Sequence, residues 1–256
     1  MRILALGDIV GLKTVAYLKD NLWSFRKSNK IDFVVANGEN TNDIFGLGLD
    51  EAKALLACGV DVLTTGNHVW GRRDIYDFLD NTEAVIRPAN YPSGAPGSGY
   101  TVINVDGFKV LCINALGTVF MDSLSSPFEA VDAVLEREKE NYDIAILDVH
   151  AEATSEKLAM GLYFDGKVTA IFGTHTHVQT ADERVLEKGS GYITDLGMTG
   201  PKNGILGVDK DCVLYRFLTK MPKRYTVADG EIEAQGAVFE IDPFAKKTLS
   251  VKRVKF

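Results

Sequence analysis

The histidines of this chain are its most informative residues. There are only four in 256 residues, and His175 and His177 stand one residue apart in the stretch GTHTHVQTAD, residues 173–182. In an extended chain, side chains at i and i+2 point to the same side, so both imidazoles are expected to face one point. Imidazole binds Zn, Mn, Fe and similar ions. The pair therefore indicates metal chemistry, with a purely structural pair as the alternative.

Further ligand-type side chains follow the apolar runs of the sequence. Five apolar runs end in side chains of this type, and in four of the five a glycine is next to the ligand-type residue. The candidates, which include all four histidines, are Asp8, Glu39, Asn40, Asn67, His68, His150, His175 and His177. A single Asp or His at a strand end usually caps or hydrogen-bonds, and Asn37 and Asn40 could be turn residues. The set as a whole is better explained by a ligand site.

Eight candidate ligands are more than one metal ion needs, because a tetrahedral site takes four. The number fits two ions that share one carboxylate. Two ions about 3.5–4 Å apart can hold a hydroxide between them and clamp the oxygens of an in-line displacement. The carboxylates of Asp8 and Glu39 neutralise only half the charge of two divalent ions. The site is therefore expected to attract a phosphate ester.

The elements that must position these residues alternate between strands and helices. Strands are predicted at residues 3–6, 33–36, 60–64, 110–115, 144–149, 168–172 and 192–196. Helical patterns cover Val15–Phe25, Glu51–Cys58 before Gly59, and Phe128–Leu135 after Pro127. Open α/β sheets place their sites at the carboxyl ends of strands. The pattern predicts a layered α/β fold with the ligands along one edge.

Beyond Gly200 the pattern changes to strands without helices. Cys212–Leu218, Ala237–Ile241 and Leu249–Val254 are predicted as strands, which form a second sheet or extend the first. No repeat or flexible linker interrupts the chain, so residues 1–256 are predicted to form a single domain. The Pro- and Gly-rich loop Arg87–Tyr100 is either a connection or part of the wall of the site.

The residues after His150 offer further candidates. Thr154 or Ser155, together with Glu156, is expected to cap a helix that continues to Tyr163. Glu152 is a candidate for orienting a ligand histidine through a hydrogen bond. Two other carboxylates, Asp182 and Asp195, are weaker candidates for the same orienting role.

Composition limits the classes of partner. The chain has 28 Lys and Arg against 35 Asp and Glu, a formal net charge of −7, which argues against a long nucleic acid as ligand. Cys58, Cys112 and Cys212 show no Cys-x-x-Cys spacing, as expected of buried thiols in a reducing compartment. No apolar run reaches the length of about 18 residues that spans a membrane. A cytoplasmic protein is predicted, with no membrane partner.

The motifs resemble those of the calcineurin-like metallophosphoesterases. These are GD at residues 7–8, GNH at 66–68, the strand-end His150 and GTHTH at 173–177. More closely, the chain resembles the YmdB-like family over nearly its whole length, through MRILALGDIVG, NGEN, GNHVW, RPANYP, HAEATSEK, GTHTHVQTAD and TDLGMTGP. The resemblance implies an α/β/β/α metallophosphoesterase-type sandwich with a metal site at the carboxyl ends of its strands.

Residue roles are implied by this resemblance, position by position. It assigns three ligands to each of two ions and one bridging ligand: Asp8, Asn40 and His177; Asn67, His150 and His175; and Glu39 as the bridge. The Asp-x-His of the wider superfamily is replaced here by Asp8-Ile9-Val10, so Asn40 would take the vacant place. His68 is implied as the general acid, which suits an imidazole that titrates near neutral pH. A structural role for His68 is the alternative.

The resemblance also implies an activity. It describes a dinuclear metal-dependent phosphodiesterase, in which a metal-bridging hydroxide attacks phosphorus and His68 protonates the leaving oxygen. The implied substrates are small phosphodiesters such as 2′,3′-cyclic nucleotides, and the implied cofactors are two divalent or trivalent ions, Fe or Mn, with Zn as a further option. Self-association is implied as well. The alternatives are a regulatory binding protein that retains its metal site and a phosphomonoesterase.

Two loops depart from the family pattern. After Asp8, the residues GLKTVAYL stand where the family has Pro-Gly-Arg, and the loop is shorter. The stretch Thr41–Gly46, TNDIFG, replaces a more glycine-rich segment. Both follow predicted metal ligands, so substrate preference is expected to differ more readily than metal binding.

Overall fold

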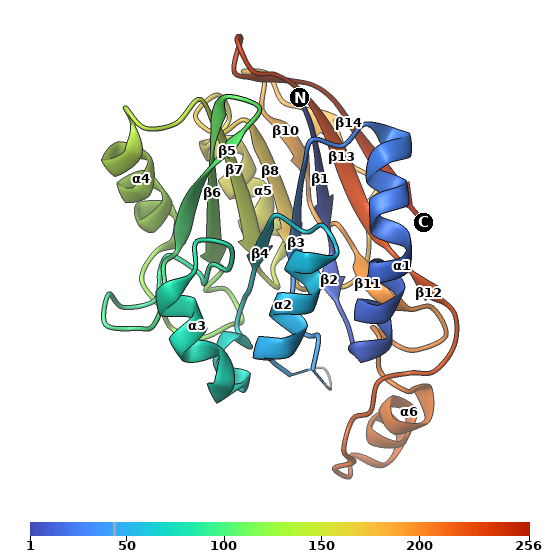
Figure 1. Ribbon diagram of the computed structural model, residues 1–256. Coiled ribbons are helices and arrows are strands. Elements are labelled where there is room, and N and C mark those ends of the chain that lie inside the picture. Colours follow the sequence, from blue (N-terminus) through green and yellow to red (C-terminus); the bar gives the residue numbers. More distant parts are fainter. Residues whose placement is uncertain (43–44) are drawn as a thin grey trace.

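The computed structural model describes residues 1–42 and 45–256. Two main sheets pack face to face, and helices cover the outer side of each (Figure 1). The first sheet has the strand order β14-β13-β1-β3-β4, and the second has the order β5-β6-β7-β8-β10-β9. A small third sheet has the order β12-β11-β2. This is the predicted α/β/β/α sandwich.

The strands of the first sheet are β1 (Arg2–Leu6), β3 (Phe33–Asn37), β4 (Val62–Thr64), β13 (Gln235–Asp242) and β14 (Lys247–Lys255). Those of the second are β5 (Tyr100–Val105), β6 (Phe108–Leu116), β7 (Ile144–His150), β8 (Ala170–Thr174), β9 (Arg184–Val185) and β10 (Gly191–Ile193). The third contains β2 (Asp8–Ile9), β11 (Met198–Pro201) and β12 (Ile232–Glu233). The helices are α1 (Leu12–Asn29), α2 (Leu49–Ala57), α3 (Tyr76–Asn81), α4 (Pro127–Glu138), α5 (Thr154–Tyr163) and α6 (Lys210–Thr219), with 3₁₀ turns η1 (Val69–Gly71) and η2 (Arg73–Ile75).

Three apolar layers hold the sandwich together. In β1, Ile3 and Ala5 belong to the layer between the two sheets, whereas Leu4 and Leu6 belong to the layer beneath α1 and α2. The third layer joins the second sheet to α4 and α5. Because the central strands are buried on both faces, most positions along them are apolar. This burial explains why the strands appear in the sequence as continuous apolar runs.

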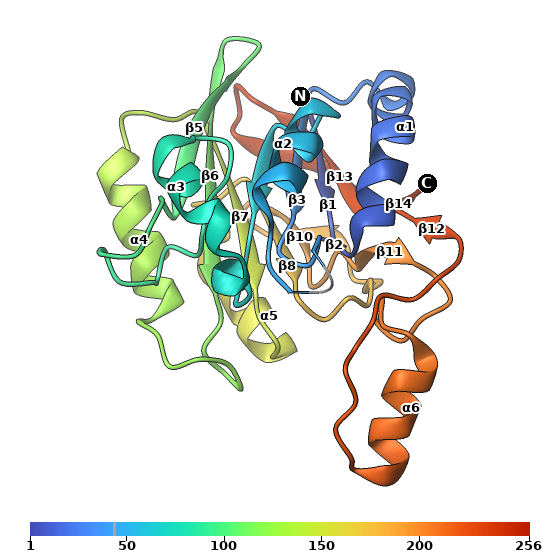
Figure 2. The same ribbon diagram turned by 60° about the horizontal axis from the view of Figure 1, so that its bottom comes forward.

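The parallel strands bring their carboxyl ends to one edge of the molecule. β1 pairs in parallel with β3, and β3 with β4. In the second sheet, β6, β7, β8 and β10 are parallel in turn. These ends point downward in Figure 1, and Figure 2 brings them forward. Side chains that follow the strands of both sheets are therefore placed close together.

The strand prediction for Cys212–Leu218 is wrong, because these residues form most of α6. Asp209 caps this helix by accepting hydrogen bonds from the backbone N–H groups of Asp211 and Cys212. The apolar residues that resembled a buried strand are largely exposed on the helix, with Leu218 at 81%. α6 projects from the body of the molecule (Figure 2). The other two predicted strands are confirmed as parts of β13 and β14, which extend the first sheet.

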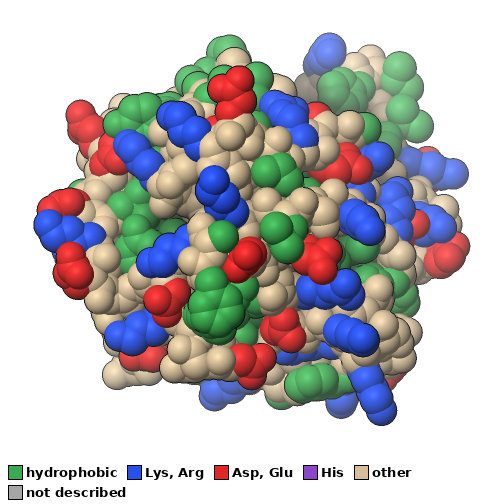
Figure 3. Space-filling model, turned by 90° about the horizontal axis from the view of Figure 1, so that it is seen from above, with side chains coloured by type: hydrophobic (Ala, Val, Ile, Leu, Met, Phe, Trp, Pro, Cys, Tyr) green, Lys and Arg blue, Asp and Glu red, His purple; other side chains and the backbone are tan. Residues whose placement is uncertain are grey.

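Three predictions made from the composition concern the surface charges, the cysteines and membrane-spanning helices. Figure 3 views the molecule from above Figure 1 and shows Lys and Arg side chains interspersed with Asp and Glu. Cys58, Cys112 and Cys212 are buried free thiols, as predicted. Within residues 1–42 and 45–256, no helix combines the length and the apolar character needed to cross a membrane.

Candidate metal centre

The structure brings all eight predicted site residues into one cluster. They come from five strand ends: Asp8 after β1, Glu39 and Asn40 after β3, Asn67 and His68 after β4, His150 at the end of β7, and His175 and His177 after β8. Each of the eight contacts at least one other member through a side chain or backbone N–H. The cluster therefore spans both sheets, as the strand-end pattern predicts.

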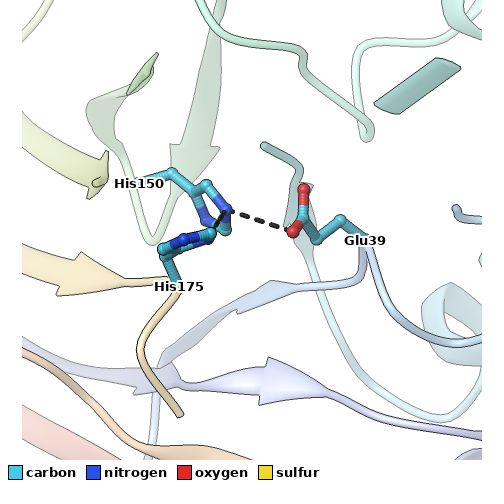
Figure 4. Close-up of side chains that lie close together, drawn as sticks. All are labelled: Glu39, His150 and His175. Atoms are coloured by element: carbon cyan, nitrogen blue, oxygen red, sulfur yellow. Dashed lines mark hydrogen bonds and ion pairs between the residues drawn. The ribbon is translucent and has the colours of Figure 1, made fainter. Parts of the chain in front are cut away.

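One half of the cluster surrounds Nε2 of His150. This nitrogen lies 3.1 Å from Glu39 Oε1, 3.1 Å from Asn67 Oδ1 and 3.1 Å from His175 Nδ1. Figure 4 shows the Glu39 carboxylate and the two imidazoles turned toward one another. Candidate ligand atoms of Glu39, His150 and His175 lie within 4.8 Å of one another. Nitrogen and oxygen donors this close together form the kind of group that binds a transition metal.

The other ring nitrogen of His150 is already occupied. His150 Nδ1 lies 2.9 Å from Thr174 Oγ1, and that hydroxyl donates to Asp148 Oδ1 at 2.7 Å. A hydroxyl that donates to a carboxylate is free to accept from an imidazole N–H, so Nδ1 carries the proton. Thr64 also donates its hydroxyl to Asp148. This chain of hydrogen bonds leaves Nε2 of His150 free to face the other candidate ligands.

Removing the hydroxyl of Thr174 tests this chain. Thr174→Val should weaken metal binding by about 10–100-fold, because His150 loses the acceptor that fixes its tautomer and ring orientation. Metal titration followed by calorimetry measures the change. Thr248→Val is the matched control: its hydroxyl is also buried and donates to Thr169 O at 2.7 Å, away from the cluster. Equal metal affinity in both variants would contradict the role of Thr174.

The second half of the cluster lies between Asp8 and His177. Asp8 Oδ1 lies 3.7 Å from His177 Nε2, and Asp8 Oδ2 accepts a hydrogen bond from the backbone N–H of His175. Asn40 points its Nδ2 toward His177 Nε2, at 3.3 Å, and its Oδ1 toward His68 Nδ1, at 2.9 Å. To offer Oδ1 to an ion beside His177, the Asn40 amide would have to turn over. Asp8 and His177 therefore fit a second metal position as they stand, whereas Asn40 needs this adjustment.

Two buried carboxylate oxygens show that the cluster suits cations. Asp8 Oδ1 and Glu39 Oε1 are shielded from solvent, and neither has an aligned hydrogen bond among the described residues. A carboxylate oxygen buried without a hydrogen bond is costly unless it is paired or bound to a metal. Each oxygen lies in a different half of the cluster. The donor set therefore fits metal binding in both halves.

The same charges shift the pKa values of the cluster. Burial favours a raised pKa for Glu39, but attraction from His150 and His68 prevails and lowers it to about 2. Burial favours a lowered pKa for His150, but the carboxylates of Glu39, Asp8 and Asp148 raise it to about 9. The pKa of His175 falls to about 3 through burial and repulsion from His150. Burial raises the pKa of Asp8 above its usual value. The shifts of Glu39 and His150 pair the buried Glu39 carboxylate with a protonated imidazole, and a bound metal ion would take over that positive charge.

The expectation of an extended His-x-His segment is wrong. β8 ends at Thr174, and the φ angles of His175 and His177 are 96° and 62°. Positive φ is unfavourable for residues other than glycine and is often found at functional sites. Thr176, between them, donates its N–H and its hydroxyl to Asp195 Oδ2. The turn directs the two imidazoles to different halves of the cluster instead of to one point.

Gly66 allows the strand ends to approach so closely. A Cβ atom at this position would lie 2.2 Å from His150 Cδ2 and 2.5 Å from Glu39 Oε2. Such contacts are shorter than any side chain tolerates, so residue 66 must be glycine for β4 to end against the cluster. The glycine of the GNH motif is thus explained by close packing against two candidate ligands.

The helix after β7 is not capped as predicted. α5 follows Ala153 as its N-cap residue, and no side chain caps it. The carboxylate of Glu156 instead accepts hydrogen bonds from the backbone N–H groups of Thr118 and Val119. Glu156 therefore secures the loop after β6 and leaves the helix end to its backbone.

The three carboxylates considered for orienting roles differ in their contacts. Glu152 Oε2 lies 3.1 Å from His175 Nε2, where it can orient that ring. Asp195 accepts hydrogen bonds from the N–H and the hydroxyl of Thr176, so it holds the turn between the two histidines instead of orienting an imidazole. Asp182 accepts hydrogen bonds from the hydroxyls of threonines 180 and 194, and it contacts none of the four described histidines. Asp148, which supports His150 through Thr174, was not identified from the sequence.

A cavity of about 390 Å³ opens in front of the cluster. Its polar wall is formed by Glu39, Asn40, His68, Glu152, His175, Thr176 and His177. Its apolar wall is formed by Phe45, Leu206, Val208 and Tyr225, which were not identified from the sequence. None of the described lining residues comes from the Arg87–Tyr100 loop. Of its two possible roles, the loop is therefore a connection, between α3 and β5. Of the divergent stretch TNDIFG, Asp43 and Ile44 lie outside the described residues.

Comparison with known proteins places this geometry in a family. The profile of the family described as "YmdB-like protein" matches residues 4–254. A 2′,3′-cyclic-nucleotide 2′-phosphodiesterase of Bacillus subtilis (strain 168) is 43% identical over 256 residues, covering 99% of this chain and 96% of the relative. The crystal structure of a hypothetical protein from Thermus thermophilus has a TM-score of 0.94 and 37% identity, covering 100% of this chain and 99% of that one. A phosphatase from Mycoplasma pneumoniae has a TM-score of 0.94 and 33% identity, covering 100% and 93%.

Proposed function

Because the chain belongs to the YmdB-like family, we propose that it hydrolyses 2′,3′-cyclic nucleotides at a centre of two metal ions. The predicted enzyme class, a phosphoric-ester hydrolase, is confirmed by the comparisons. The substrate is proposed from the Bacillus subtilis relative, which is named for 2′,3′-cyclic nucleotides. The observation that carries the two-metal proposal is the pair of buried oxygens, Asp8 Oδ1 and Glu39 Oε1, that lack aligned hydrogen bonds in the two halves of the cluster.

The geometry supports a division of the ligands between the two ions. Asn67, His150 and His175 would hold one ion, and Asp8, His177 and Asn40 the other, with Glu39 shared. The contacts around His150 Nε2 support the first group, and the approach of Asp8 to His177 supports the second. Nitrogen and oxygen donors without thiolate suit iron and manganese, the metals we propose, and also zinc.

The residues of the chain would share the work of hydrolysis. Bound ions supply an activated water and neutralise charge on the phosphoryl oxygens. His68 Nδ1 is held by Asn40 Oδ1 at 2.9 Å, and the backbone N–H of His68 donates to Glu39 Oε2 at 2.9 Å. These contacts fix the imidazole at the cavity. Once the Asn40 amide has turned over to offer Oδ1 to an ion, its Nδ2 would donate to His68 Nδ1 and leave the ring proton on Nε2, ready for the leaving oxygen. As the P–O2′ bond breaks, O2′ takes that proton, and the product is a nucleoside 3′-phosphate.

A panel of three substrates tests the proposed function. The protein loaded with manganese or iron should hydrolyse adenosine 2′,3′-cyclic phosphate faster than the linear diester bis(p-nitrophenyl) phosphate, and the monoester p-nitrophenyl phosphate most slowly. Steady-state rates and chromatography of the products provide the readout. A preference for the monoester would establish a phosphomonoesterase instead. Bound metal without turnover of any of the three would favour a regulatory binding protein.

A further inference from the structure

The apolar wall of the cavity has no part in the chemistry described so far. Phe45, Leu206, Val208 and Tyr225 lie across the same cavity as the ligand cluster. Metal ions and a phosphate need charged and polar partners, so they do not account for this wall. Exposed apolar groups that gather at a cavity usually mark a surface that binds an apolar part of a ligand.

Phe45 is the most prominent residue of this wall. Its side chain is 57% exposed, and its ring centroid lies 4.4 Å from that of His68, with the ring planes 35° apart. An exposed aromatic ring beside the proposed proton donor adjoins the reacting end of the substrate. The exposure leaves part of the ring free to contact a ligand.

Backbone hydrogen bonds and close packing hold Phe45 and Gly46 in place. The N–H of Phe45 donates to Asn42 O at 2.8 Å, and the N–H of Asn42 donates to Gly46 O at 3.2 Å. Gly46 has a φ of 85°, and a Cβ there would lie 2.9 Å from both Gly71 C and Arg72 Cγ. Only glycine permits this close approach with a positive φ. Phe45 is therefore fixed against the 3₁₀ turns that follow His68.

Tyr225 is also supported from behind. The Arg216 guanidinium carbon lies 4.4 Å from the centroid of the Tyr225 ring, within range of a cation–π contact. Backbone hydrogen bonds join its segment to the stretch that carries Leu206 and Val208: the N–H of Asp209 donates to Thr226 O at 2.9 Å, and that of Ala228 to Gly207 O at 2.9 Å. The aromatic wall is thus built on two anchored segments far apart in the sequence.

We infer that Phe45 forms a stacking site for the base of the nucleotide, with Tyr225 as the second aromatic residue of the same site. This inference rests on the proposed function, because it assigns the part of the substrate that lies away from the phosphate. The phosphate would lie at the metal cluster and the base against the aromatic wall. Stacking accepts every base, because each base has a π face. Purine and pyrimidine 2′,3′-cyclic nucleotides should therefore both be substrates.

The test compares a substrate with a base and one without. Adenosine 2′,3′-cyclic phosphate and glycerol 1,2-cyclic phosphate contain the same five-membered cyclic diester. Phe45→Ala should lower the ratio of their kcat/KM values by about 10–100-fold, the range expected for loss of one stacking contact. Any disturbance of His68 in this variant affects both substrates and cancels in the ratio. Phe45→Tyr should restore the ratio, whereas Phe45→Leu should restore it only in part.

Phe244→Ala provides a matched control, because Phe244 is 85% exposed at the turn between β13 and β14. Its ratio should equal that of the unaltered protein. An unchanged ratio in Phe45→Ala would overturn the inference, as would an unaltered protein that hydrolyses both substrates equally well. If neither substrate is hydrolysed, the proposed function fails, and calorimetry then decides the stacking site separately. Phe45→Ala should bind adenosine 3′-phosphate about tenfold or more weakly relative to glycerol phosphate, and equal relative affinity would overturn the inference.

Discussion

His68→Ala should lower kcat for adenosine 2′,3′-cyclic phosphate by about 10²–10⁴-fold and leave the metal content unchanged. The reason is that His68 contacts the cluster through Asn40 Oδ1 and Glu39 but is not needed to complete either group of ligands. Its loss should remove a proton donor and not a metal ion. Steady-state kinetics with elemental analysis of the same sample measures both quantities.

The leaving group provides the control for this prediction. A p-nitrophenolate can leave without being protonated, whereas a ribose alkoxide needs a proton to leave. His68→Ala should therefore reduce the hydrolysis of bis(p-nitrophenyl) phosphate much less than that of the cyclic nucleotide. Equal losses on the two substrates, or loss of metal, would mean that His68 has a structural role.

Lys157→Met should lower the free energy of unfolding by about 3–5 kcal/mol. Lys157 Nζ lies 2.7 Å from Asp195 Oδ2, and both side chains are only 1% exposed. Replacing the lysine leaves the Asp195 carboxylate buried without its counter-charge. Met fills a similar volume, so little of the loss comes from an empty space. Urea unfolding followed by circular dichroism measures the change.

An exposed ion pair of the same length is the matched control. Lys139 Nζ lies 2.7 Å from Glu136 Oε1, but its side chain is 57% exposed. Lys139→Met should change the free energy of unfolding by less than about 1 kcal/mol. Similar values for the two variants would show that the buried pair contributes no more than a surface pair. Because Asp195 also accepts from Thr176, Lys157→Met should in addition loosen the turn that carries His175 and His177.

The layered fold and the position of the cluster could be predicted from local sequence patterns. Strands buried on both faces are mostly apolar, so β1, β3, β7 and β8 can be recognised in the sequence as apolar runs. Parallel strands gather their carboxyl ends at one edge, so residues such as Asp8 and His150 were expected to meet. The roles of individual ligands were implied by the family resemblance, since spacing alone does not assign a residue to one ion or the other.

What could not be predicted depends on contacts that are distant in the sequence or on exposure. The exposed Phe217 and Leu218 of α6 were mistaken for a buried strand, because hydrophobicity does not reveal which surface a residue faces. The positive φ angles of His175 and His177 depend on the packed turn held by Asp195. Tyr225 reaches the cavity only through tertiary packing, outside any motif.

The most direct test of the account is a metal titration of activity. Protein stripped with a chelator should be inactive on adenosine 2′,3′-cyclic phosphate. Added manganese should restore turnover until two ions are bound per chain, because each half of the cluster contains a buried carboxylate oxygen without an aligned hydrogen bond. Elemental analysis at each point gives the number of bound ions. Full activity in the stripped protein, or a plateau at one ion per chain, would contradict the two-metal centre.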